Sequence, residues 1–408
     1  MIKQIDGGVT SAKGFEAAGV YAGIKYKNRN DMALIYSKSP CDAAGVFTRN
    51  VVKAAPVVWD RQIIDNCDAM HAVIINAGIA NACTGQEGLG YCKTTAEAAA
   101  KSFGIKPENI AVASTGVIGM QLPIDKIVAG IDLLNNAKGA DREHAHIAAQ
   151  SIMTTDTKPK EVAFEFEVGG KIARIGGMCK GSGMIHPNMC TMLCFITTDV
   201  AISKKLLTEA LRNDVDDTFN MISVDGDTST NDTVLLMANG EAGNVKIEEK
   251  GHDYDTFCEA LHGVMEGLSK LIAGDGEGCT CLFECKVINA NTKENARTLA
   301  KSVITSNLTK AAIFGRDANW GRILCALGYS GVNFDPEKVD IFFESSAGKL
   351  KIVENGVSTG YSEEKATEIL SQEYVTALCD MKGGIESATA WGCDLTYEYV
   401  KINGDYRS

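Results

Sequence analysis

Residues 161–168 (EVAFEFEV) alternate polar and apolar side chains, apart from the small apolar Ala163 at a polar position. Successive side chains of a β-strand point to opposite faces, so this alternation predicts a strand with one buried face and one solvated face. Such strands are typical of antiparallel sheets, because the strands of a wholly parallel sheet are covered on both sides. The segment therefore favours a fold with substantial antiparallel sheet.

Strand-like and helix-like segments are mixed along the rest of the chain. Short apolar or β-branched runs predict strands at residues 72–76, 192–198, 233–237, 281–288, 339–343 and 395–402. Helical periodicity predicts helices at residues 94–103, 124–135, 143–153, 203–211, 254–272 and 293–306. The order lacks the regular strand–helix alternation of a doubly wound sheet, which favours a layered α/β or α+β architecture.

Charge and hydropathy narrow the class of partner. The formal net charge is −12, whereas nucleic acids and anionic membranes both reward a basic surface, so we expect neither as a partner. No apolar run is long enough to span a bilayer, and residues 1–15 lack the apolar core of a secretory signal. By elimination we expect a cytoplasmic protein, with a composition compatible with small-molecule chemistry.

The fourteen cysteines are best interpreted as reduced thiols, because disulfide frameworks belong to secreted chains. The tightest group, Cys279, Cys281 and Cys285, lacks the paired spacing of a structural zinc site, and the six histidines supply no HExxH motif. We therefore expect no metal. A redox protein is an alternative class, and it would need a thiol beside a positive group. Cys179, next to Lys180, is the candidate that we consider for this setting.

Residues 179–199 (CKGSGMIHPNMCTMLCFITTD) contain the most informative segment of the chain. A glycine-rich turn runs through Pro187 and Asn188 into an apolar strand that begins with Thr191. Threonine is common in strands, so spacing alone favours a loop that leads into a core strand.

The run KGSGMIHPNMCTML resembles the signature of the ornithine acetyltransferase family, also called the bifunctional glutamate N-acetyltransferase family. Further segments resemble motifs of that family in the family's order, at residues 7–15 (GGVTSAKGF), 81–85 (NACTG), 114–119 (STGVIG), 229–232 (STND), 275–278 (DGEG), 315–322 (GRDANWGR) and 402–408 (INGDYRS). The resemblance therefore covers nearly the whole chain.

This resemblance implies that the chain cuts itself after Cys190, giving an α chain (1–190) and a β chain (191–408) that begins with Thr191. A free α-amine has a pKa of about 7.7–8.0 and can take a proton from a neighbouring hydroxyl near neutral pH. Thr191 would then supply both nucleophile and general base. The implied reaction is ping-pong transfer of an acetyl group from N2-acetylornithine to glutamate. It needs no cofactor, although some members of the family also use acetyl-CoA as donor.

The resemblance also implies roles for other residues. Thr115, through its side chain, and Gly116, through its backbone, would form an oxyanion hole after an apparent strand at residues 110–113. The residues at the family's substrate-binding positions are Thr154, Lys180, Thr191, Glu277, Asn403 and Ser408. The cation of Lys180 and the anion of Glu277 suit amino-acid substrates, which carry both charges. Without the resemblance, residues 114–116 would be interpreted as an ordinary strand-to-loop turn.

The chain departs from the family pattern at a few positions. His186 and Cys190 both stand where alanine is usual, and Gly404 and Ser408 replace alanine and threonine at the end. Cysteine is still small and leaves the carbonyl chemistry unchanged, so we expect cleavage to survive. We expect His186 to be a loop residue with no catalytic role.

The fold implied by the resemblance is a layered α/β/β/α sandwich of the N-terminal-nucleophile type. A smaller C-terminal domain would occupy roughly residues 285–392, with a last strand and tail that return to the active site. The family usually assembles as an α2β2 heterotetramer. The alternative function is an amidase or aminopeptidase of the same fold, which would pass the acyl group to water rather than to glutamate.

Overall fold

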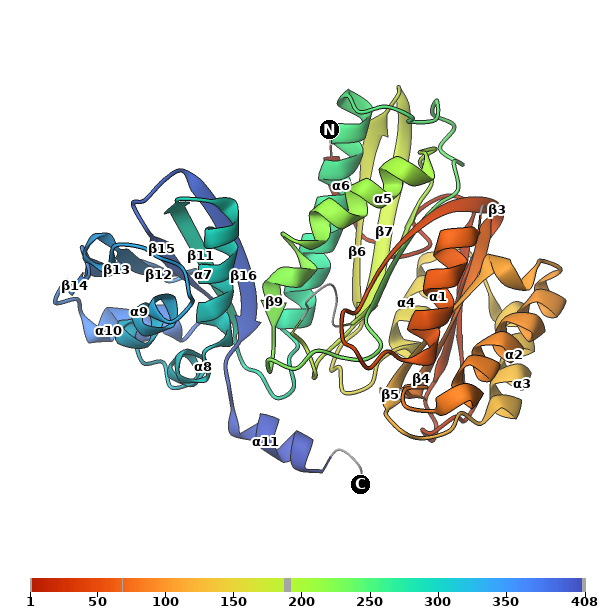
Figure 1. Cartoon of the computed structure of the whole chain (residues 1–408), viewed down its shortest axis with the longest axis horizontal. Helices are drawn as coiled ribbons and strands as arrows, with labels where there is room; N and C mark the ends of the chain where they lie inside the picture. Colours follow the sequence, from red (N-terminus) through yellow and green to blue (C-terminus); the bar gives the residue numbers. More distant parts are fainter. Residues whose placement is uncertain (1, 68, 187–191, 406–408) are drawn as a thin grey trace. The chain divides into compact units, whose positions relative to one another are not determined.

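A computed structural model describes residues 2–67, 69–186 and 192–405 of the chain (Figure 1). Three predicted site residues, Cys190, Thr191 and Ser408, therefore lie outside the described residues. The chain divides into two units. The first comprises Met1–Gly181, Asn188–Asp216 and Thr228–Leu268, and the second comprises Ser182–Pro187, Asp217–Asp227 and Ser269–Ser408. The predicted division at Thr191 concerns the covalent chain and stays a prediction.

A nine-stranded sheet forms the centre of the first unit. Its strands are β1 (Ile2–Ile5), β2 (Phe15–Val20), β3 (Met32–Phe47), β4 (Met70–Ile79), β5 (Ile110–Val117), β6 (Lys160–Val168), β7 (Lys171–Lys180), β8 (Leu193–Thr198) and β10 (Thr233–Ala238). Their order is β1-β6-β7-β8-β10-β3-β4-β5, with β2 also paired to β3. The pairs β4–β5 and β8–β10 are parallel and the other pairs are antiparallel, so the sheet is mixed and largely antiparallel, as predicted.

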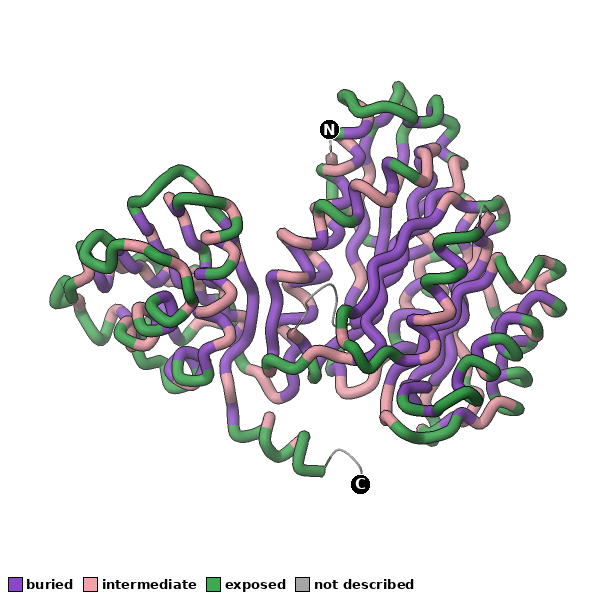
Figure 2. Tube along the Cα trace, in the orientation of Figure 1, coloured by how far each residue is buried: buried purple, intermediate pink, exposed green. Residues whose placement is uncertain are grey.

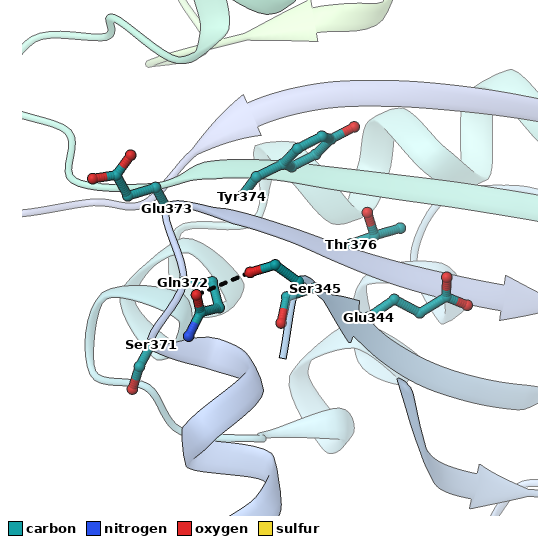
Figure 3. Close-up of a pocket in the computed structure, with 8 residues that line it drawn as sticks. Glu344, Ser345, Ser371, Gln372, Glu373, Tyr374 and Thr376 are labelled. Atoms are coloured by element: carbon teal, nitrogen blue, oxygen red, sulfur yellow. Dashed lines mark hydrogen bonds between the residues drawn. The ribbon is translucent and has the colours of Figure 1, made fainter. Parts of the chain in front are cut away.

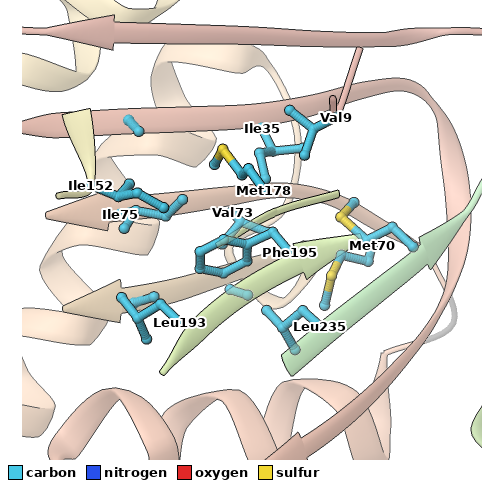
Figure 4. Close-up of a cluster of buried hydrophobic side chains, with 14 of the residues drawn as sticks. Val9, Ile35, Met70, Val73, Ile75, Ile152, Met178, Leu193, Phe195 and Leu235 are labelled. Atoms are coloured by element: carbon cyan, nitrogen blue, oxygen red, sulfur yellow. The ribbon is translucent and has the colours of Figure 1, made fainter. Parts of the chain in front are cut away.

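The long strand β3 joins two layers of this sheet. Its first part pairs with β2 and β4, its last part pairs with β10, and the register shifts between Tyr36 and Cys41. A shift of this kind bends a strand. Apolar residues of β7, β8 and β10, among them Phe195, then pack against those of β4, among them Val73 and Ile75, in one buried cluster (Figure 4). The core of the first unit therefore lies between two layers of sheet.

Helices flank both layers, and residues of the first and fourth helices also belong to the cluster between the layers. The helices are α1 (Ala55–Asn66), α2 (Gly85–Phe103), α3 (Ile124–Ala137), α4 (Arg142–Ser151), α5 (Lys204–Val215) and α6 (His252–Ala273), and a short 3₁₀ helix spans Pro107–Asn109. Helices α2 and α3 share a second apolar cluster with the other face of β4 and β5. Helix α6 packs closely on β6 and β7, because a side chain at Gly177 would touch Val264 and Leu268. The predicted α/β/β/α layering is confirmed within this unit. Most of the sheet is buried, whereas much of the covering helices is exposed (Figure 2).

The second unit is built on a seven-stranded sheet of order β14-β13-β12-β15-β11-β16-β9. The strands are β9 (Ile222–Ser223), β11 (Leu282–Ala290), β12 (Asp340–Ser345), β13 (Gly348–Glu354), β14 (Val357–Ser358), β15 (Tyr374–Asp380) and β16 (Glu386–Cys393). The helices are α7 (Lys293–Thr305), α8 (Asn307–Phe314), α9 (Trp320–Gly328), α10 (Glu363–Leu370) and α11 (Tyr397–Gly404), with 3₁₀ helices at Phe219–Met221 and Pro336–Lys338. Helix α7 packs on β11 and β16.

The strand predicted at residues 395–402 is wrong, because this segment contains helix α11. Its alternation of β-branched and aromatic residues is typical of a strand, but the segment leaves the sheet after β16, which already pairs with β11 and β9. A segment without a sheet partner can satisfy its backbone groups internally only as a helix. The other predicted strands and helices are confirmed, with α2 beginning earlier than expected.

We found no helix among the described residues that combines the length and apolarity needed to cross a membrane.

Candidate active site

The predicted oxyanion residues lie at the end of β5, where two backbones touch. Thr115 is buried and pairs with Ala77 of β4, and Gly116 pairs with Gly78. Gly116 has a φ of +128°, in the region that favours glycine, and a Cβ atom there would overlap the carbonyl group of Gly78. Only glycine therefore fits at position 116. The motif has a steric reason of its own, in addition to the role that the resemblance implies.

A buried polar network surrounds this strand end. The Ser114 hydroxyl donates to Asn76 Oδ1 at 2.6 Å, and Asn76 Nδ2 donates to the Ile79 carbonyl at 2.9 Å. Asn231 Nδ2 donates to the carbonyls of Ala80 and Ser114, at 2.6 and 2.8 Å. Sequence reasoning placed residues 229–232 in a motif but gave Asn231 no role. Its contacts join segments that are 117 and 151 residues apart, which no local pattern can indicate.

Thr154 and Lys180 are brought together by a residue that sequence reasoning missed, Asp156. The side chain of Asp156 is fully buried. It accepts hydrogen bonds from Lys160 Nζ at 2.7 Å, from the Thr154 N–H at 2.9 Å and from the Gly181 N–H at 2.7 Å. Lys180 Nζ lies 4.0 Å from Asp156 Oδ2, the oxygen that accepts from Thr154. One carboxylate therefore organises two lysines and two predicted site segments.

The charges in this group favour an ionised Asp156. Burial alone would raise the pKa of the Asp156 carboxyl, but the charges of Lys180 and Lys160 outweigh burial and hold the pKa below its ordinary value. Lys180 is the last residue of β7 and its side chain is only 10% exposed, so it is not a solvated loop lysine. No hydrogen bond joins its ammonium to another residue in the described part of the chain, so its three donors can serve an anionic group of a substrate.

The pKa of a second buried carboxyl group, that of Asp232, is shifted in the opposite direction. Neither of its oxygens has a hydrogen-bond partner of ordinary geometry among the described residues. Burial raises the pKa of Asp232 well above its ordinary value, although nearby Ser229 and Thr48 hydroxyls and the Lys180 charge oppose this. Its neighbour Thr233 donates a backbone hydrogen bond to Met192, the residue that follows Thr191 in the chain. Burial therefore favours the protonated form of the Asp232 carboxyl group, which lies beside the start of β8.

The second unit brings together Glu277 and Asn403, two of the residues to which the resemblance assigns substrate binding. Asn403 Nδ2 donates to Glu277 Oε2 at 2.7 Å, and the backbone N–H of Glu277 donates to the Ser182 carbonyl at 3.0 Å. A side chain at Gly183 would overlap the Glu277 carboxylate, so the glycine-rich turn leaves room for this group. The side chain of Thr396, just before α11, donates to the Gly278 carbonyl at 2.7 Å. Helix α11 thus docks on the loop that carries Glu277.

His186 is held in the second unit by Ser223, with Nδ1 3.1 Å from the hydroxyl oxygen. Burial, and then the charge of Lys301, lower the pKa of His186 to about 4. The imidazole is therefore neutral across the physiological pH range and carries no charge into the neighbouring segment.

The cysteine that the redox alternative requires is poorly placed for that chemistry. Cys179 is 1% exposed, and its thiol donates to the Leu268 carbonyl of α6. Reactive thiols are usually accessible to reagents, so this setting favours a structural thiol.

A cavity of about 730 Å³ lies in the second unit, between the ends of β12 and β15 and of α10 (Figure 3). It is lined by Glu344, Ser345, Ser346, Ser371, Gln372, Glu373, Tyr374 and Thr376. Several of its polar groups are already paired, including Ser346 with Gln372 and Tyr374 with Glu284. None of the predicted site residues lines it, so it is separate from the candidate site.

Comparisons with known proteins agree with the motifs and fold described above. The model of the ArgJ family matches residues 16–408. The chain is 51% identical over 400 residues to the arginine biosynthesis bifunctional protein ArgJ 1 of Clostridium acetobutylicum, covering 98% of this chain and 97% of that protein. It is 50% identical over 404 residues to ArgJ of Caldanaerobacter subterraneus subsp. tengcongensis, covering 99% of both. A crystal structure of ArgJ from Bacillus halodurans is 44% identical with a TM-score of 0.50, over 52% of this chain and 97% of that one.

The fold, the motifs and these relatives place the chain in the class of ornithine acetyltransferases. The resemblance predicted from the sequence is therefore confirmed. The chain belongs to the ArgJ family.

Proposed function

We propose that this enzyme transfers the acetyl group of N2-acetylornithine to glutamate, after it has cut its own backbone between Cys190 and Thr191. The product pair would be N-acetylglutamate and ornithine. The names of the relatives, bifunctional proteins of arginine biosynthesis, support this reaction. The observation that carries it is Lys180, a buried ammonium that Asp156 holds in place and that has no hydrogen bond to another described residue.

Self-cleavage creates the catalytic base. The Thr191 hydroxyl attacks the Cys190 carbonyl carbon, the amide C–N bond between the two residues breaks, and water hydrolyses the resulting ester. The products are a carboxylate on Cys190 and a free α-amine on Thr191. With a pKa of about 7.7–8.0, a sizeable fraction of this amine is neutral near physiological pH.

Acetyl transfer then proceeds in two half-reactions. The neutral α-amine accepts the hydroxyl proton while Thr191 Oγ1 attacks the acetyl carbonyl. The oxyanion forms near the Thr115 hydroxyl and the Gly116 N–H, and its collapse expels the amine of ornithine, which takes the proton. The amine of glutamate attacks the acetyl-threonine ester in the same way, and Thr191 leaves as the free hydroxyl.

The buried charges suit these amino-acid substrates. Lys180 would bind a substrate carboxylate, because its three donors have no other hydrogen-bond partner among the described residues. Glu277 would bind a substrate ammonium, and Asn403 fixes the orientation of its carboxylate. Thr154 and Ser408 complete the substrate contacts that the resemblance implies. The proposal requires no cofactor, and acetyl-CoA would serve as an alternative acetyl donor to Thr191. The proposal also includes an α2β2 assembly, which the family resemblance implies, and a cytoplasmic location, which the sequence predicts.

Trapping the acetyl-enzyme tests the proposal. The enzyme is mixed with N2-acetylornithine in the absence of glutamate, quenched and analysed by mass. The β chain should gain the mass of one acetyl group and lose it when glutamate is added, with formation of N-acetylglutamate. If the donor is hydrolysed equally fast with and without glutamate, the enzyme is the amidase of the alternative function.

A further inference from the structure

Asn231 bonds both to the chain just after β4 and to β5, the strand that carries the proposed oxyanion hole. Its side-chain amide donates to Ala80, directly after β4, and to Ser114, directly before Thr115 on β5. The residue is 7% exposed. We propose that Asn231 is a positioning residue for acetyl transfer, whose amide fixes the backbone direction at Thr115 and Gly116. This inference rests on the proposed function, which places the oxyanion at these two residues.

The two hydrogen bonds of Asn231 restrain the peptide groups on either side of Thr115 and Gly116. The Ser114 carbonyl belongs to the planar peptide unit that continues into Thr115, so fixing its oxygen also fixes the start of Thr115. Ala80 donates its own N–H to the Val117 carbonyl at 3.0 Å, on the far side of Gly116. Asn231 therefore restrains the chain before Thr115 directly and the chain after Gly116 through Ala80.

The restraint is needed because glycine has wide backbone freedom. Gly116 adopts a φ of +128°, one of several conformations that glycine populates readily. An oxyanion donor is effective only when it lies about 2.7–3.1 Å from the oxyanion, so a small rotation at Gly116 would weaken it. Contact with Gly78 limits this rotation on one side. Asn231 supplies a directional restraint from a third segment of the chain.

The amide of Asn231 is itself firmly held. Both partners of its Nδ2 are carbonyl oxygens, which only accept, and its Oδ1 accepts from the Thr230 hydroxyl at 2.7 Å. The surrounding loop is tied to the 48–54 segment, because Thr48 Oγ1 donates to the Ser229 carbonyl and Ala54 N–H donates to the Thr230 carbonyl, both at 2.9 Å. The orientation of the amide is thus set before substrate binds.

The first test compares Asn231→Ala with a matched control, Asn244→Ala. Asn244 is a buried residue of the same unit whose Nδ2 also donates to two backbone carbonyls, those of Ala201 and Val245. Among the described residues, none of its hydrogen bonds reaches residues 114–116. Rates are expressed per mole of cleaved enzyme. We expect Asn231→Ala to lower kcat by about 10–100-fold with KM changed less than about threefold, because misplacement of a catalytic group costs up to about 100-fold. Asn244→Ala should leave kcat unchanged.

A second variant, Asn231→Asp, separates positioning from loss of fold. An ionised carboxylate at this place would face two carbonyl oxygens, whereas a protonated carboxyl can donate to one of them. We expect the kcat of this variant, relative to the parent enzyme at the same pH, to rise as the pH is lowered. A ratio that does not change with pH would contradict the proposal.

Thr115→Ala distinguishes this inference from the proposed function. If Thr115→Ala lowers kcat and the double variant with Asn231→Ala loses less than the product of the two single effects, then Asn231 acts through the oxyanion hole. If Thr115→Ala lowers kcat but Asn231→Ala does not, the positioning role is wrong and the proposed function stands. If Asn231→Ala and Asn244→Ala lower kcat equally, the effect is general stability and the positioning role is again wrong. If Thr115→Ala has no effect, the oxyanion assignment fails and the inference fails with it.

Discussion

Asn403 donates a hydrogen bond of 2.7 Å to Glu277, although the two residues are 126 positions apart in the chain. The contact brings helix α11 onto the loop of residues 275–278, and the Thr396–Gly278 hydrogen bond holds the beginning of that helix in place. The end of a chain is normally its least ordered part. Here it orients a buried carboxylate that the proposed function assigns to substrate binding.

Asn403→Ala should therefore weaken the binding of N2-acetylornithine. A hydrogen bond to a charged group contributes about 1.5–3 kcal/mol, so we expect KM to rise at least about tenfold with little change in kcat. Steady-state kinetics with varied donor measure this effect. Lys401→Ala is the control, because Lys401 lies on the same helix, is exposed and pairs only with Glu398 among the described residues. An equal rise in KM for both variants would contradict a specific role of Asn403.

Gly116→Ala should destabilise the first unit and abolish activity. The new Cβ atom would overlap the Gly78 backbone, and the φ of +128° is unfavourable for alanine. We expect a loss of unfolding free energy of more than about 2 kcal/mol in denaturant titrations, since overpacking and backbone strain add. Gly90→Ala in helix α2 is the control, because nothing lies within reach of its Cβ and alanine favours a helix by about 1 kcal/mol. A Gly116→Ala variant as stable as the parent would refute the close approach of β4 and β5.

Asp156→Asn should lower stability because it leaves Lys160 buried without its carboxylate. Breaking a buried ion pair costs about 3–5 kcal/mol. The folded-state pKa of Asp156 is lowered, so its contribution is present above the unfolded pKa of about 3.9 and is lost as pH falls toward the folded value. The difference in unfolding free energy between parent and variant should therefore be full at pH 7 and shrink below about pH 4. Asp42→Asn, at a partly exposed ion pair with Lys246, should change stability by less than about 1 kcal/mol.

Asp232→Asn should have the opposite pH dependence. The folded-state pKa of Asp232 is raised, so the folded chain keeps this proton at pH values where the unfolded chain has released it. The stability that the protonated Asp232 contributes is thus lost as pH rises above about 4. The amide that Asp232→Asn introduces does not ionise and removes this loss. We expect the variant to gain stability relative to the parent between pH 5 and pH 7, measured by denaturant unfolding at both values. A difference that stays constant over this interval would show that Asp232 is ionised when buried.

Local patterns predicted most of the fold, and tertiary contacts explain what they missed. The alternation in residues 161–168 identified β6, because a strand with one buried face has apolar side chains at about every second position. The strand prediction failed at residues 395–402, where the chain leaves the sheet after β16 and forms helix α11. Within the site, the resemblance placed Glu277 and Asn403 separately among the substrate-binding residues. The structure joins them by a hydrogen bond, and their role in substrate binding stays a prediction. Asn231 was missed because its partners are 117 and 151 residues away, and Asp156 was missed because its link to Gly181 spans 25 residues.

The intact mass of the freshly purified, denatured protein tests the central claim most directly. Autoproteolysis at Thr191 predicts two polypeptides, the heavier beginning at Thr191, and Thr191→Ala should give one uncleaved and inactive chain. A single active chain of 43.5 kDa would contradict the account, because without a free α-amine Thr191 has no base of its own.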